Sequence, residues 1–266
     1  MPMEETTTKI LFTSDSTQNQ QTICDAILSV ARRFKGELIW LQNAANAGIT
    51  QALVDDLKKR AHRDLTISEK LGEFLSSTSK SANDSRVEMT FVFAAPKVPG
   101  FMGGGMAACV SKFQNPLIYF NPSTPWVEPR NVLMLLDSHS DSRQKFYRVS
   151  VLAKMFGAKV HVLSLSSDKD NETVRYLNAY SGQGFDYMIK KGIPTNELDP
   201  KEGVDMVSTV LEEVGKIQDC WVSSMNVTDG VGFMKSGPFQ YYCAQLQVPL
   251  MACAVQEIVG SGGSGL

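Results

Sequence analysis

The chain has 266 residues, 43% hydrophobic and 20% charged, so it can bury a core without disulfide bonds and has the composition of a soluble globular protein. Its 26 basic and 28 acidic residues give a net charge of -2, which excludes a mainly electrostatic nucleic-acid binder. No stretch stays apolar for the roughly 18 residues that a membrane span requires. We therefore expect no nucleic-acid partner and no direct membrane insertion.

The first half of the chain alternates apolar runs with amphipathic stretches. The apolar runs predict strands over residues 9–13, 37–41, 87–93 and 116–120. The amphipathic stretches predict helices over residues 17–34, 51–75 and 104–113. Residues 51–85 have room for a helix, a strand and another helix, but we expect four strands in this half, with one crossover shortened or replaced by a single long helix.

Three prolines, at positions 122, 125 and 129, predict a linker over residues 121–130. Beyond it, strands are expected over residues 132–136, 159–165, 185–189, 220–223 and 248–255. Helices are expected over residues 141–156, 171–180, 204–214 and 238–246. Strands that alternate with helices favour a parallel sheet with helical crossovers.

The sequence repeats at an offset of 122 positions. The segment from Lys9 aligns without a gap on the segment from Asn131, and Asp15 meets Asp137 while Ser16 meets Ser138. Both segments read as a short apolar strand, an Asp-Ser turn, an amphipathic helix and a second strand. This repeat predicts two tandem doubly wound parallel-sheet domains of the α/β class, over residues 8–122, shortened, and residues 131–256.

The strands that end in Asp-Ser, LFTSDS and LMLLDS, and the closing strands NPLIYF and VPLMACAV resemble a tandem universal stress protein over most of residues 8–256. The resemblance implies a universal-stress-type, adenine-nucleotide-hydrolase-like fold whose halves form an intramolecular pseudo-dimer. It also implies ATP or AMP as the ligand. The acidic turns that would face adenine and ribose are Asp15 with Ser16, and Asp137 with Ser138. Because such turns also cap helices, a structural role for them stays open.

Two glycine-rich segments are the candidate phosphate-binding loops, since successive backbone N–H groups before a helix can cradle an anion. Their candidate residues are Gly103 and Gly104 in the first half and Gly230, Gly232, Ser236 and Gly237 in the second. Met234 stands where a Walker phosphate loop requires glycine, which excludes a Walker-type ATPase. Neither half reproduces the Gly-x-x-Gly, nine residues, Gly-Ser pattern of nucleotide-binding family members, so tight turns are the other interpretation.

No catalytic or metal-binding set stands out. His62, His139 and His161 lack partners at metal-ligand spacing, and no nucleophile motif is present, so we expect no metal and no catalytic residues. The predicted function is an adenine-nucleotide-binding sensor or stress-response regulator. The alternative is a scaffold or a regulatory partner or tail of a transporter whose nucleotide sites have decayed, and which works as a homodimer or through another protein. A nucleotide hydrolase of related fold is a third interpretation.

A cytoplasmic location is expected from the cysteines and the first residues. Five cysteines without a Cys-x-x-Cys pair lie in apolar stretches, which is typical of buried free thiols in a reducing compartment. MPMEETTTKI lacks the basic start and apolar run of a secretory signal. The ending GSGGSGL is of low complexity and takes no part in the predicted fold.

Overall fold

The structure is a computed structural model that describes residues 8–15, 19–43, 46–69, 74–83, 86–94, 113–138, 143–223, 242 and 245–253. In the first half the elements are β1 (Lys9–Ser14), α1 (Gln20–Arg33), β2 (Glu37–Gln42), the 3-10 helix η1 (Ala47–Ile49), α2 (Thr50–Ala61), β3 (Thr66–Glu69), α3 (Phe74–Ala82), β4 (Val87–Phe93) and β5 (Leu117–Phe120). In the second half they are β6 (Asn131–Leu136), α5 (Lys145–Phe156), β7 (Lys159–Ser164), α6 (Asn171–Lys190), β8 (Thr195–Glu197), α7 (Met206–Lys216), β9 (Cys220–Ser223) and β10 (Leu250–Ala252).

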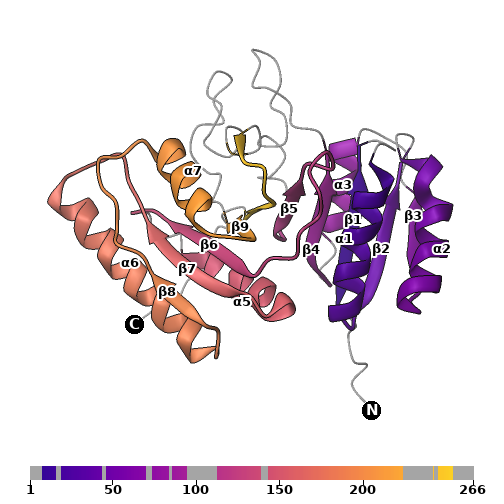
Figure 1. Cartoon of the computed structure of the whole chain (residues 1–266), viewed down its shortest axis with the longest axis horizontal. Helices are drawn as coiled ribbons and strands as arrows, with labels where there is room; N and C mark the ends of the chain where they lie inside the picture. Colours follow the sequence, from indigo (N-terminus) through magenta and orange to yellow (C-terminus); the bar gives the residue numbers. More distant parts are fainter. Residues whose placement is uncertain are drawn as a thin grey trace, which may run out of the picture.

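The strands within the described residues join one ten-stranded sheet in the order β3-β2-β1-β4-β5-β10-β9-β6-β7-β8. Within each half the pairs are parallel and the strand order is the same, whereas β5 and β10 meet antiparallel at the centre. The two halves therefore form an intramolecular pseudo-dimer of doubly wound α/β units, as the sequence predicts. Figure 1 shows the halves side by side, with the first in indigo to magenta.

The sheet is buried on both faces, which explains why its strands are almost uninterrupted apolar runs. On the face that we call the α1/α5 face, helices α1, α2, α5 and α6 cover alternate strand residues such as Phe12 and Met134. On the opposite face, α3 and α7 pack with the intervening residues such as Leu11 and Leu133. Helices on both faces are what a doubly wound sheet requires.

The expectation of four strands in a shortened first half was wrong. The predicted helix over residues 51–75 is instead α2, which ends at Ala61, followed by the edge strand β3 and by α3. His62 takes a left-handed conformation with φ 51° and stops α2, and its N–H donates to the Leu57 carbonyl. Strand β3 begins four residues later with Thr66 and Ile67, which are β-branched and pair in parallel with β2. Local β preference and sheet pairing therefore override the helical pattern.

The predicted short helix over 171–180 and strand over 185–189 were also wrong. Both segments belong to the 20-residue helix α6, which Asp170 caps by accepting from the N–H groups of Glu172 and Thr173. Gly184 lies inside this helix, and a Cβ added to it would come within 3.0 Å of Met134 Cε, so the glycine lets α6 pack closely on β6. The fifth strand of this half is β8, further along the chain. The helices expected over 104–113 and 238–246 lie almost wholly outside the described residues.

An aromatic cluster ties the linker to both halves. Trp126 of the linker packs edge to face on Trp221 of β9, with ring centroids 5.1 Å apart, and on Phe120 of β5. The Trp221 indole N–H donates to the Val127 carbonyl over 3.1 Å. The proline-rich residues 121–130 are thus fixed against the sheet at the junction of the halves.

Candidate functional site

The two acidic turns lie at corresponding positions of the sheet. Asp15 directly follows β1, which is flanked by β2 and β4, and its N–H donates to the Phe93 carbonyl at the end of β4 over 3.0 Å. Asp137 directly follows β6, which is flanked by β7 and β9. From β1 the chain adds β2 and β3 on one side and later β4 and β5 on the other, and from β6 the second half does the same. Ligands of open α/β sheets bind at this kind of switch point. We call the two places the first edge and the second edge.

The structure describes three of the ten predicted site residues, and all three are half-buried: Asp15, Asp137 and Ser138. Ser16 and the candidate loop residues Gly103, Gly104, Gly230, Gly232, Ser236 and Gly237 lie outside the described residues. The site is therefore characterised here by the strand ends and by the helices that begin beside them.

At the first edge, two buried asparagines bind the ends of the strands. The Asn46 amide donates to the carbonyls of Ser14 and Leu41, each over 3.1 Å, and its oxygen accepts from the N–H of Asn43 over 2.9 Å. The Asn43 amide also donates to the Ser14 carbonyl, over 3.2 Å. Asn46 is fully buried, and its side chain therefore occupies the carbonyl acceptors at the ends of β1 and β2.

At the second edge, the positions that correspond to Ser14 and Asn43 are apolar. Leu136 is the last residue of β6 where β1 ends in Ser14, and Leu165 follows β7 where Asn43 follows β2. Both leucines are fully buried. Among the described residues, the second edge thus has no counterpart of the asparagine network at the first.

A fully buried lysine lies beneath the second edge. Lys145, the first residue of α5, is 0% exposed, and its ammonium donates to the Leu135 carbonyl over 2.6 Å. Burial lowers the pKa of Lys145 to about 8, although the charge of Asp137, and that of Cys253 when its thiol is ionised, act in the opposite direction. Burial likewise raises the pKa of the Cys253 thiol to about 11, so this thiol is protonated at neutral pH.

Three buried hydroxyl groups belong to the elements around Lys145. Ser164 ends β7 beside Leu136, and Ser223 ends β9 beside Met134, so strand alternation places both on the α1/α5 face. Ser181 belongs to α6, on the same face. Each hydroxyl oxygen is buried and has no hydrogen-bond partner among the residues that the structure describes. Such groups are costly to bury, and they lie on the same face of the sheet as the buried lysine.

Sequence reasoning missed Lys145 and Asn46. Lys145 stands in the polar run SRQK and Asn46 in NAANA, and neither pattern differs from an ordinary solvated segment. The repeat carried the one usable signal for the lysine, because the offset of 122 aligns Lys145 with Ile23, a fully buried residue of α1.

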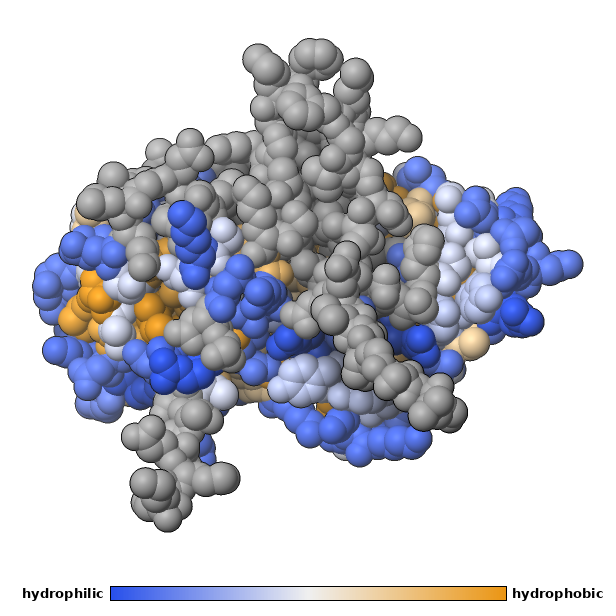
Figure 2. Space-filling view, turned by 180° about the vertical axis from the view of Figure 1, so that it is seen from behind, coloured by the Kyte–Doolittle hydropathy of each residue, from blue (hydrophilic) through white to orange (hydrophobic). Residues whose placement is uncertain are grey.

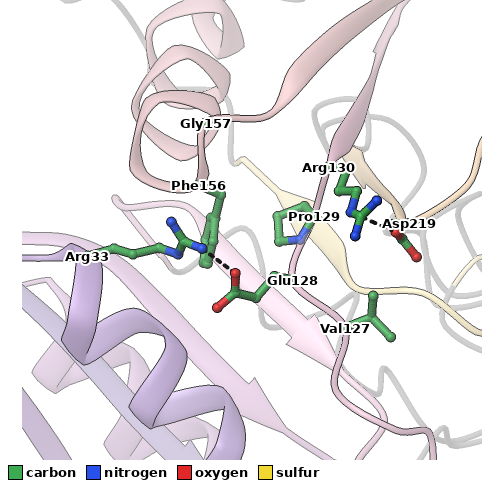
Figure 3. Close-up of a pocket in the computed structure, with 8 residues that line it drawn as sticks. All are labelled: Arg33, Val127, Glu128, Pro129, Arg130, Phe156, Gly157 and Asp219. Atoms are coloured by element: carbon green, nitrogen blue, oxygen red, sulfur yellow. Dashed lines mark hydrogen bonds and ion pairs between the residues drawn. The ribbon is translucent and has the colours of Figure 1, made fainter. Parts of the chain in front are cut away.

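A separate cavity of about 530 Å³ lies between the halves. Figure 3 shows Arg33 pointing to Glu128 and Arg130 pointing to Asp219, so each guanidinium is paired with its own carboxylate. Burial would raise the pKa of Glu128, but hydrogen bonds from Arg33 and Ser29 outweigh this and hold it below the usual range. Arg33 also lies over the Phe156 ring, 5.6 Å from its centroid. The end of α1, the end of α5 and the linker all line this cavity.

The described residues offer neither a cluster of metal ligands nor a membrane-spanning helix. They contain no group of three or more His, Cys, Asp or Glu side chains that could hold a metal ion. None of the helices described is long and apolar enough to cross a membrane. Three of the five cysteines are described, and Cys24, Cys220 and Cys253 are all free and buried.

No protein-family model and no curated protein matches the sequence. Solved structures do match the fold over nearly the whole chain. A universal stress protein from Archaeoglobus fulgidus DSM 4304 aligns with a TM-score of 0.62 and 12% identity, covering 93% of this chain and 98% of that one. A functionally unknown protein from Pseudomonas aeruginosa PAO1 aligns with a TM-score of 0.64 and 10% identity, over 94% and 93% of the two chains. The chain therefore has the universal-stress-type fold in its full-length, two-unit form.

Proposed function

We propose that the protein binds an adenine nucleotide at its second edge and acts as a sensor or regulator of the universal stress type, without catalysing a reaction. The proposal is supported by the fold, which brings Asp137 to a switch point of the sheet. In this proposal Asp137 accepts hydrogen bonds from the nucleoside, and the glycine-rich segment that includes Gly230, Gly232, Ser236 and Gly237 donates backbone N–H groups to the phosphates.

The difference between the two edges carries this proposal. At the first edge, Asn43 and Asn46 bind the strand-end carbonyls, so a ligand would have to displace a buried hydrogen-bond network. At the second edge no such network is present among the described residues, and a buried cation lies below it. An anionic ligand gains from that cation. We therefore assign binding to the second half and a structural role to the first edge.

The residues fit binding better than turnover. No histidine, cysteine or carboxylate of the described part of the second edge is positioned as a nucleophile with an adjacent base. The Cys253 thiol is buried, and its raised pKa makes it a poor nucleophile at neutral pH. What this edge offers is charge, hydroxyl groups and a carboxylate, which are groups that recognise a nucleotide.

The first experiment denatures freshly purified protein, identifies any released small molecule by mass spectrometry and titrates the intact protein with ATP, ADP and AMP by calorimetry. We expect Asp137→Ala to weaken binding about tenfold to a hundredfold, because a charged hydrogen bond contributes about 1.5–3 kcal/mol. The matched control is Asp15→Ala at the first edge, which we expect to bind like the wild type.

Equal affinity in the wild type and Asp137→Ala would contradict the assignment to the second edge, and a loss confined to Asp15→Ala would move the site to the first edge. If no adenine nucleotide binds at all, the alternative of a scaffold that works through protein contacts takes over. One observation favours that alternative: Figure 2 shows a hydrophobic area on the side of the first half within an otherwise largely hydrophilic described surface. In that case the oligomeric state and the bound proteins become the quantities to measure.

A further inference from the structure

The burial of the Lys145 ammonium group costs free energy. Lysine is almost never fully buried unless it is paired, yet this side chain is 0% exposed. Its hydrogen bond to the Leu135 carbonyl is the only one that its ammonium makes with the described residues. Its position as the first residue of α5 adds to the cost, because the positive end of the helix dipole disfavours a cation there.

The first half shows that the fold does not need a lysine at this position. Ile23 of α1 aligns with Lys145 and packs, fully buried, in the core of the α1/α5 face. An apolar side chain therefore fills the same place under the first edge, where Asn43 and Asn46 bind the strand ends. The charge occurs only under the edge that lacks this network.

The charged and titratable groups near Lys145 are few. Asp137 after β6 and Cys253 after β10 are the described groups whose charges act on it. Arg143, two residues before Lys145, lies over the Tyr180 ring of α6, 5.4 Å from its centroid. Arg148 of α5 pairs with Glu88 of β4. One carboxylate therefore faces the ammonium, and the hydroxyls of Ser164 and Ser223 end the flanking strands.

We propose that Lys145 is the anion sensor of the second edge: at alkaline pH it takes up a proton when a phosphorylated ligand binds beside Asp137 and releases it when the ligand leaves. This rests on the proposed function, to which it adds a regulation by pH. Lys145 need not touch the ligand, since it acts through the field at the edge. It is thus a positioning residue whose charge state follows occupancy.

The direction of the effect follows from linkage. Burial already lowers the pKa of Lys145 to about 8, and a bound anion would raise it again. At an effective dielectric constant of about 20, one negative charge about 6 Å away changes the protonation equilibrium roughly a hundredfold. Ligand affinity should therefore be constant below about pH 8 and fall as the pH rises through the next two units.

The test is calorimetric titration of the full chain with AMP, ATP and inorganic phosphate at pH 7, 8.5 and 9.5, each in two buffers of different ionisation enthalpy. The phosphate of AMP has its second pKa near 6, so it does not titrate in this window. We expect the wild type to take up part of a proton at pH 8.5 and to lose about twentyfold in affinity by pH 9.5.

Lys145→Gln keeps a donor for the Leu135 carbonyl but cannot become charged. We expect this variant to bind at least tenfold more weakly at pH 7, with no proton uptake and no change of affinity with pH. Lys145→Met is the second variant, and a thermal melt of each checks that it folds. Ile23→Met, at the aligned position of the first half, is the matched control and should behave like the wild type.

The outcomes separate this inference from the proposed function. Nucleotide binding that is equally strong in Lys145→Gln, without proton uptake in the wild type, overturns the inference and leaves the proposed function standing. Lys145-dependent binding of inorganic phosphate without any nucleotide binding overturns the proposed function and leaves the inference standing. If neither phosphate nor nucleotide binds, both are wrong.

Discussion

The buried charge of Lys145 predicts that replacing it makes the protein more stable at neutral pH. The pKa of this lysine falls from 10.5 to about 8 on folding. At about 1.4 kcal/mol per unit of pKa, that difference corresponds to about 3 kcal/mol against the folded state when Lys145 is charged in the unfolded chain. The penalty is complete below about pH 8, where the folded protein also holds the proton.

The sign follows from proton counting. Between pH 8 and 10.5 the unfolded chain binds more protons at this residue than the folded chain, so stability due to Lys145 rises with pH across that window. Lys145→Met has no such group and fits a similar volume. The stability of the variant relative to the wild type should therefore be constant from pH 6 to 8 and then shrink by about 3 kcal/mol up to pH 10.5.

The assay is urea unfolding of the ligand-free wild type and Lys145→Met at pH 6, 7, 8, 9, 10 and 10.5, followed by circular dichroism. Only the difference between the two proteins is interpreted, because the titration of other lysines, tyrosines and thiols then largely cancels. Ile23→Met supplies the control for a methionine at this depth. A difference in unfolding free energy that does not change between pH 8 and 10.5 would falsify the claim that burial lowers the pKa of Lys145.

Two further predictions concern the first edge and the junction of the halves. Asn46→Ala should lower the unfolding free energy by about 2–4 kcal/mol, because it removes three buried hydrogen bonds. In the same urea assay, Asn178→Ala at an exposed position should change the unfolding free energy by less than about 0.5 kcal/mol. Equal effects of the two substitutions would refute a structural role of the asparagine network. For the pair Arg33 and Glu128, which is about 40% exposed, a double-mutant cycle should give a coupling of only about 0.5–1 kcal/mol. That coupling should be present at neutral pH and lost as acid protonates Glu128, whose pKa is lowered, and a coupling unchanged at pH 3 would speak against the ion pair.

The sequence was sufficient for the architecture where periodicity is strong. Apolar runs such as residues 132–136 can be buried on both faces only in a covered parallel sheet, and the repeat at offset 122 correctly predicted two units of one plan. It was insufficient for β3 and α6. Thr66–Glu69 becomes a strand because β2 offers an open edge, and α6 runs through Gly184 because β6 lies close beneath it. Both decisions depend on a neighbour that lies far away in the sequence.

The place of the two acidic turns in the sheet was predictable from the sequence, whereas the side chains buried beneath them were not. A strand that ends in Asp-Ser locates Asp15 and Asp137 at the switch points without any structure. The contrast between the edges was not accessible, because burial, not residue type, makes Lys145 and Asn46 unusual. An exposed lysine at the start of a helix would have read the same. The glycine-loop predictions stay predictions, since those residues lie outside the described ones.

The two halves share one backbone plan and differ in what lies under their first and second edges. At the first edge asparagines bind the strand-end carbonyls, whereas the second edge holds a buried ammonium that donates to the Leu135 carbonyl. Helix α5 begins at that charge and ends at Phe156, on whose ring Arg33, the last residue of α1, is stacked. Helix α5 and this one ring contact therefore connect the second edge to α1 of the first half.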